Sequence, residues 1–108
     1  MSIITDQLHI SITEEGRLLA NAVVSAESDS SWVQASLHVE PGQLPAGTSS
    51  KLVEAVLELT EAQPGTSVQV SFPLGEAELL EQMRQRCGEV EVRAAGASCL
   101  FSGVVTAN

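Results

Sequence analysis

The stretch from Leu37 to Leu59 reads LHVEPGQLPAGTSSKLVEAVLEL and decides the fold. An alternating apolar segment ends at Pro41, a loop containing Gly and Pro leads to Thr48, and a segment with helical apolar spacing follows. This order predicts a strand, a glycine-containing loop and a helix. The first N–H groups of such a helix have no intrahelical partner and point in one direction, which is a common way to hold phosphate groups. The loop is therefore the candidate ligand site of this sequence.

Length and composition limit the classes of protein to which the chain can belong. With 108 residues it is expected to form one domain, and with 44% hydrophobic but only 3% aromatic residues its core must be mainly aliphatic. Fourteen acidic and five basic residues give a formal net charge of −9, which disfavours binding to nucleic acids and to anionic membranes. The first residues, MSIITDQLHISI, contain neither a basic cluster nor a sustained apolar run. We therefore expect a cytoplasmic protein without a signal peptide or membrane span.

Apolar periodicity predicts an α+β fold with a mixed, mainly antiparallel sheet of five to seven strands and two helices, in the order βββ-α-β-α-ββ. The first three strands are joined by short polar turns and should form an antiparallel meander. The expected strands are 8–13, 17–25, 32–39, 68–72, 89–94 and 98–105, and the expected helices are 48–62 and 76–87.

The same periodicity predicts which side chains form the core. In the second strand, Leu18 and Ala20 should lie on one face and Leu19 on the other. In the second helix, Cys87 should complete a buried stripe with Leu79, Leu80 and Met83. The main core residues are expected to be Ile10, Ile12, Val33, Leu37, Leu52, Val56, Leu59, Val68, Val70, Leu79, Met83 and Phe101.

The strand, the V-x-P sequence, the glycine-containing loop and the helix KLVEAVLEL together resemble the cofactor-binding core of the GCN5-related N-acetyltransferases (GNATs). The resemblance implies a GNAT-like fold over 32–105, without the N-terminal helices that form the acceptor side in that family. In that family a loop of the form Q/R-x-x-G-x-G/A gives its backbone amides to the pyrophosphate of acyl-CoA. On this chain the resemblance implies that Gln43, Gly47 and Thr48 are the cofactor-binding residues. Ala46 stands in place of the first glycine, and Pro45 removes one amide donor.

Candidate catalytic residues are few. GNAT catalysis needs a base and often a tyrosine, and the chain contains no Tyr. His38 and Glu40 are the groups placed to act as a base, because both precede the loop and alternate onto one face of a strand. The alternative is that they form a solvated strand end and that the chain has no catalytic residue. His9 and His38 lack further ligands at a metal-binding spacing, so no metal site is predicted.

Three other residues suggest structure or contacts rather than catalysis. Cys87 and Cys99 lie in apolar-periodic segments without a CxxC spacing, which is typical of reduced, buried thiols. Trp32 alternates with polar residues, so its indole is expected either at a protein contact or over the edge of the core.

These observations leave three classes of function. The first is a non-catalytic binding or regulatory module on a GNAT-like scaffold, with no cofactor and with a protein partner or self-association. The second is a small acyl-CoA-dependent N-acetyltransferase that binds acetyl-CoA. The third is a self-associating structural subunit, suggested by Trp32 and by sheet edges that a short chain must protect.

Overall fold

A computed structural model of the chain describes residues 2–6, 9–26, 32–60 and 62–106. It contains a seven-stranded mixed sheet and two helices, which confirms the expected α+β class. Strands and helices follow one another as β1 (Ser2–Asp6), β2 (His9–Glu14), β3 (Arg17–Ala26), β4 (Trp32–Val39), α1 (Thr48–Leu59), β5 (Ser67–Pro73), α2 (Ala77–Arg86), β6 (Cys87–Ala95) and β7 (Ser98–Val105).

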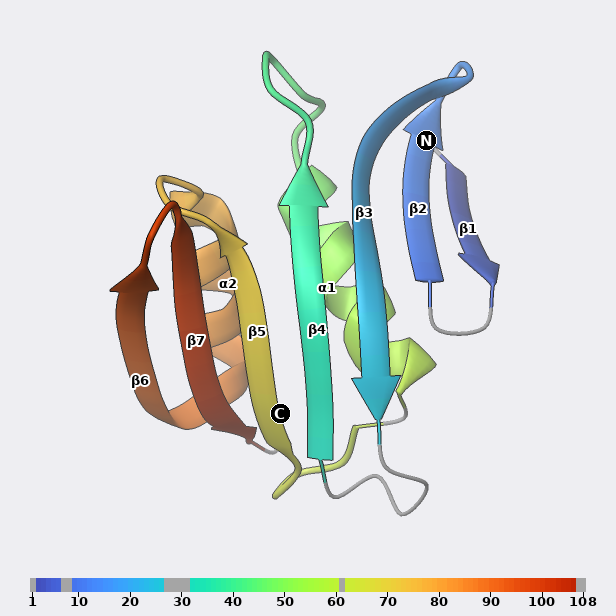
Figure 1. Cartoon of the computed structure of the whole chain (residues 1–108). Helices are drawn as coiled ribbons and strands as arrows, with labels where there is room; N and C mark the ends of the chain where they lie inside the picture. Colours follow the sequence, from blue (N-terminus) through green and yellow to red (C-terminus); the bar gives the residue numbers. More distant parts are fainter. Residues whose placement is uncertain (1, 7–8, 27–31, 61, 107–108) are drawn as a thin grey trace.

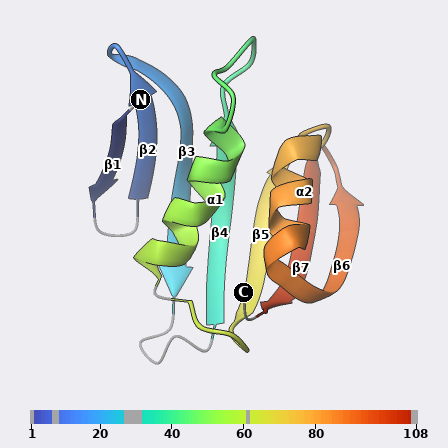
Figure 2. The same cartoon turned by 180° about the vertical axis from the view of Figure 1, so that it is seen from behind.

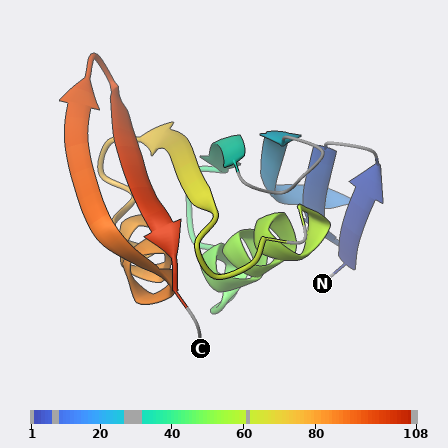
Figure 3. The ribbon, with the colours of Figure 1, turned by 90° about the horizontal axis from the view of Figure 1, so that it is seen from below.

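The strands lie in the order β1-β2-β3-β4-β5-β7-β6, and β4 and β5 form the parallel pair at the centre of the sheet (Figure 1). All other neighbouring strands are antiparallel. Both helices lie on the same face of the sheet (Figure 2). Helix α1 covers β3 and β2, and α2 covers the half of the sheet that contains β7 and β6 (Figure 2). Seen from below, the two helices lie on one side of the strands (Figure 3). Within the described residues no helix lies on the opposite face of the sheet, which we call the helix-free face (Figure 3).

The structure adds one strand to the expected order. Residues of β1 pair with β2 in antiparallel register, for example Ile3 with Ile12, so four strands rather than three precede α1. A segment of five residues gives too few alternations to stand out from sequence periodicity alone. The expected start of the first strand at Leu8 lies outside the described residues.

A β-bulge in β3 corrects the predicted orientation of Leu19. Ile12 pairs with Ala20 while Thr13 pairs with Leu18, so Leu19 is the additional residue between the two pairs. Because a bulge sets two residues against one, Leu19 and Ala20 both turn into the core and both are fully buried. The prediction that Leu19 lies opposite Ala20 is therefore wrong.

Both helices end earlier than the sequence suggests. The first stops at Leu59, where the Thr60 hydroxyl donates to the carbonyl of Val56 at 2.9 Å and the Ala62 N–H donates to Leu57 at 3.1 Å. These bonds satisfy the last carbonyls of the helix and turn the chain away. The second helix ends at Arg86, and Cys87 already has extended backbone angles as the first residue of β6.

The hydrophobic core lies between the sheet and the two helices. Side chains of β4 alternate regularly, with Val33, Ala35, Leu37 and Val39 buried toward the helices. Eleven of the twelve expected core residues are buried, and Leu59 is the exception because it is only partly buried near the end of α1. Cys87 is buried as expected, but from the start of β6 and not from a helix.

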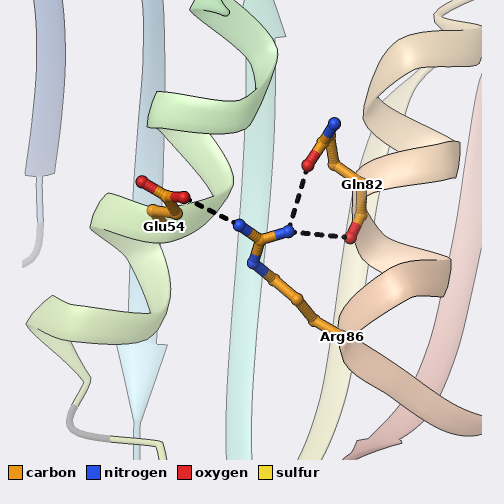
Figure 4. A network of polar contacts seen from close by, with 3 residues as sticks. All are labelled: Glu54, Gln82 and Arg86. Carbon is orange, nitrogen blue, oxygen red and sulfur yellow. Dashed lines mark hydrogen bonds and ion pairs between the residues drawn. The ribbon is translucent and has the colours of Figure 1, made fainter. Parts of the chain in front are cut away.

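A polar contact on the surface joins the two helices (Figure 4). The Arg86 guanidinium donates from Nη2 to Glu54 Oε1 at 2.9 Å and from Nη1 to Gln82 Oε1 at 3.0 Å. Glu54 is on α1 and the other two residues are on α2. Because the Glu54 side chain is well exposed, this ion pair contributes at most about 1 kcal/mol to stability.

Candidate functional site

The two central strands separate at the end that leads into the loop. The parallel pairing of β4 with β5 runs from Trp32 with Ser67 to Ser36 with Ser71, and then stops. β4 continues to Val39 and β5 to Pro73, each held there by its other neighbour. Figure 1 shows the arrowheads of β4 and β5 diverging at this end. The divergence places an opening in the backbone pairing directly beside the loop that begins at Glu40.

Pro73 gives a physical reason for the end of this pairing. The neighbouring residue Leu74 donates its N–H to Ala97 at the β6–β7 turn, so Leu74 points toward β7. Successive residues of a strand direct their backbone groups to opposite sides, and Pro73 therefore faces β4. Proline has no N–H to donate, so the ladder cannot continue through it.

The loop between β4 and α1 closes on itself. Gly47 is the N-cap residue of α1, with φ 87° and ψ 1°, a left-handed conformation that favours glycine. The next residue, Thr48, is 2% exposed, and its hydroxyl and its N–H both donate to the carbonyl of Pro45, at 2.7 and 3.3 Å. The first bond of the helix proper runs from Lys51 to Gly47.

This closure decides how the predicted cofactor-binding residues are arranged. Gln43 and Gly47 are exposed in the loop, whereas the Thr48 amide and hydroxyl point inward to Pro45. Pro45 itself offers no N–H. Pro45 thus supplies no amide and the Thr48 amide is engaged within the loop, so these two positions do not offer an N–H to a pyrophosphate. Cofactor binding by Gln43, Gly47 and Thr48 stays a prediction.

The structure brings the two candidate base residues together. His38 Nε2 lies 2.9 Å from Glu40 Oε2, and the His38 side chain is 49% exposed at the diverging end of β4. With a carboxylate accepting from Nε2–H, the neutral imidazole carries its lone pair on Nδ1. This geometry allows the ring to take up a proton from solvent or from a ligand. The sequence indicated the two residues but not their contact.

A hollow on the helix-free face is a feature that the sequence analysis missed. It has a volume of about 670 Å³ and lies over β4, β5, β7 and β6. Its polar lining consists of Gln34, Gln69, Ser71, Glu91, Arg93 and Ser102. The only signal in the sequence is that polar residues alternate with buried ones in four separate strands, and their alignment depends on strand order and register.

The remaining candidates are placed without forming a site. Trp32 is half-buried at the start of β4, on the helix-free face, and its role at a protein contact stays a prediction. Cys87 and Cys99 are free and buried, and burial raises the pKa of the Cys87 thiol although Arg86 acts in the opposite direction. Both thiols lie in the hydrophobic core, as their apolar-periodic segments predict. His9 is exposed on β2, two strands away from His38.

Two further observations concern metals and membranes. Within 2–6, 9–26, 32–60 and 62–106, no three His, Cys, Asp or Glu side chains are grouped so that they could hold a metal ion. Neither of the helices in the described part of the chain has the length and apolar character needed to span a membrane.

Comparison with known proteins identifies the fold. The sequence matches no family model and no curated protein. Among solved structures, Ard1 from Thermoplasma volcanium has a TM-score of 0.62 at 16% sequence identity. The match covers 93% of this chain and 72% of the Ard1 chain. The GNAT domain of PAT from S. lividans has a TM-score of 0.61 at 8% identity over 94% of this chain.

A third solved structure is that of yncA, a putative acetyltransferase from Salmonella typhimurium with its cofactor acetyl-CoA. It has a TM-score of 0.58 at 13% identity over 93% of this chain. The chain spans 64% of the length of this protein and of the PAT domain. These similarities show that the chain has a GNAT-like fold, in agreement with the strand order and the diverging β4–β5 pair. The fold covers about two thirds of the length of such acetyltransferases.

Proposed function

We propose that this chain is a non-catalytic binding module built on a GNAT-like scaffold. The observation that carries the proposal is the closed loop before α1, where Thr48 directs both its hydroxyl and its amide to the carbonyl of Pro45. The Thr48 donors are thus bonded within the loop instead of being presented to a ligand. This loop supports a role in which the GNAT-like scaffold is used without binding a phosphate group.

Electrostatics support the same conclusion. Acetyl-CoA is a polyanion, and the formal net charge of −9 on this chain opposes its approach. Lys51 is the basic residue in the first turn of α1 that could offset this repulsion, and it is exposed. One exposed ammonium group contributes little against the field of the whole protein and is screened by salt.

We expect acetyl-CoA to bind this protein weakly or not at all. The physical reason is the loss of two loop donors at Pro45 and Thr48, together with the negative net charge. Isothermal titration calorimetry measures the affinity, and the Salmonella typhimurium protein that holds acetyl-CoA serves as the positive control. A dissociation constant in the low micromolar range for this chain would contradict the proposal.

A second candidate function is acyl-CoA-dependent N-acetylation. It is favoured by the His38–Glu40 contact of 2.9 Å at the diverging end of β4, and by structural neighbours that were solved with acetyl-CoA. Here His38 would accept a proton through Nδ1, and Glu40 would fix the tautomer and orientation of the ring. The alternative thus assigns the base to this pair.

The two functions differ in a direct assay. A thiol reagent follows the release of CoA from acetyl-CoA in the presence of a set of primary amines. The binding-module proposal predicts no release above the rate without protein. The acetyltransferase alternative predicts release that falls by a factor of about 10² to 10⁴ in His38→Ala and by less in Glu40→Ala, as is typical of a general base and its positioning residue. An Arg84→Ala variant, altered at an exposed residue on α2, should behave as the unmodified protein.

A further inference from the structure

We propose that the edge strand β6 pairs with β6 of a second copy of this chain, antiparallel about a two-fold axis at Val92. The inference names a partner for the proposed binding module and rests on that proposal.

The first observation is that β6 lies at the edge of the sheet with β7 as its neighbour. From Glu91 to Ala95 every residue of β6 is exposed, and this segment is in regular register with β7. A shift in register between Gly88 and Glu91 ends the regular part on the other side. An exposed, regular edge offers a row of unpaired N–H and C=O groups to another strand.

The hydrogen-bonding pattern shows which residues offer these groups. In β7, Val105 donates its N–H to Thr66 before β5, and the next residue, Thr106, donates to Arg86 before β6. Even-numbered residues of β7 therefore face β6, among them Leu100 and Ser102, which are opposite Arg93 and Glu91. It follows that Arg93 and Glu91 bond to β7, while Val92 and Ala94 direct their backbone groups outward.

Charge then selects the register. In a two-fold antiparallel pair, the axis passes between two copies of the same residue, which can be any residue from Val90 to Ala94. An axis at Glu91 or at Arg93 would set two copies of the same charged side chain directly opposite one another. An axis at Val90 would place Glu89 opposite Glu91 twice, and like charges directly opposite one another are destabilising. An axis at Ala94 would move Glu91 beyond the end of the partner strand, opposite Ala97.

An axis at Val92 pairs the charges of Glu91 and Arg93. Glu91 of each copy lies opposite Arg93 of the other, so that two opposite-charge pairs form on the helix-free face. On the other face Val92 meets Val92 of the second copy, and this side chain is 38% exposed in the single chain. Because Glu91 and Arg93 also line the hollow, the pairing brings the hollows of the two copies together at the axis.

The net charge sets the conditions for the test. Two copies with a formal charge of −9 each repel one another at low ionic strength. At an ionic strength of about 0.15 M the Debye length is about 8 Å, so the overall repulsion is screened more strongly than the contacts between Glu91 and Arg93. Association should therefore be measured at this ionic strength.

Sedimentation analysis of the whole chain tests the proposal. We expect the unmodified protein to form dimers and both Arg93→Glu and Glu91→Arg to be monomeric, with dissociation constants raised about 100-fold or more by like charges across the axis. An equimolar mixture of these two variants should form dimers again, because each Glu then faces an Arg of the other copy. Circular dichroism verifies that every variant is folded.

Arg17→Glu is the matched control, since it makes the same change of charge at an exposed residue of β3, four strands from β6. It should leave the dimer intact. The proposal is overturned by a monomeric unmodified protein, by single charge variants that still form dimers, or by a mixture that does not reassociate. It is also overturned if Arg17→Glu abolishes the dimer. None of these outcomes changes the acetyl-CoA titration, so failure of the β6 pairing and failure of the binding-module proposal are distinguishable.

Discussion

Replacing Leu52 by Ala is expected to lower the free energy of unfolding by about 2 to 5 kcal/mol. The Leu52 side chain is 0% exposed on α1, where it packs in the cluster between the helix and the sheet. The substitution removes buried methyl groups and leaves a cavity that a close-packed core fills only in part. Since small domains are stable by only about 5 to 15 kcal/mol, this loss is a large share of the total. Chemical denaturation followed by circular dichroism measures it.

Leu74→Ala is the control for this experiment. Leu74 is 48% exposed in the turn before α2, so removing its methyl groups should change the free energy of unfolding by about 0.5 kcal/mol or less. If Leu52→Ala cost as little as Leu74→Ala, the face of α1 that packs on β2 and β3 would be assigned wrongly. The comparison therefore tests the orientation of the helix and not merely the presence of a core.

The architecture could be predicted because local periodicity reports it directly. The alternation of Val33, Ala35, Leu37 and Val39 along β4 and the spacing of Leu52, Val53 and Val56 in α1 correspond to the faces that are buried. The order of strands and helices from β2 onward follows from the same patterns. Prediction failed at short or irregular segments, because β1 has only five residues and the bulge at Leu19 breaks the alternation by one residue.

The candidate site was predictable in composition but not in contacts. The sequence identified His38, Glu40 and the loop from Gln43 to Thr48, since polar residues, proline and glycine interrupt the apolar pattern there. It could not show that Thr48 folds back onto Pro45, because a hydrogen bond within a loop depends on backbone angles that periodicity does not encode.

The hollow and the charge pattern of the β6 edge were missed for a different reason. Gln34, Gln69 and Glu91 are separated by more than twenty residues in the sequence and come together on one face only through the order β4-β5-β7-β6. The parallel pairing of β4 with β5 and the placement of β6 outside β7 depend on contacts between residues that are far apart in the sequence. Features that depend on strand order emerge from the assembled sheet, and these are the features on which the pairing proposal rests.

The second large effect is expected from Gly103→Ala, which should lower the free energy of unfolding by about 1 to 3 kcal/mol. Gly103 lies on β7, and an added Cβ would be 3.1 Å from both Cys87 Cβ and the Gly88 carbonyl oxygen. Neither contact involves the end of a flexible side chain, so the backbone where α2 joins β6 must shift. Ordinarily Ala in a strand is more favourable than Gly, and a loss of stability would therefore report the crowding alone.

Gly88→Ala separates this crowding from a general effect of replacing glycine in the β6–β7 pair. Its Cβ would meet only the Thr106 Cγ2 methyl, at 3.2 Å. Thr106 is exposed, so movement of its side chain relieves the contact at the cost of at most one surface hydrogen bond, from its hydroxyl to the Arg86 carbonyl. We expect its free energy of unfolding to lie within about 0.5 kcal/mol of that of the unmodified protein. Equal stabilities of the two variants in urea denaturation would mean that Gly103 of β7 does not pack closely against Cys87 at the start of β6. A marked difference in the expected direction would instead confirm the close approach of the two strands, which fixes the position of the β6 edge.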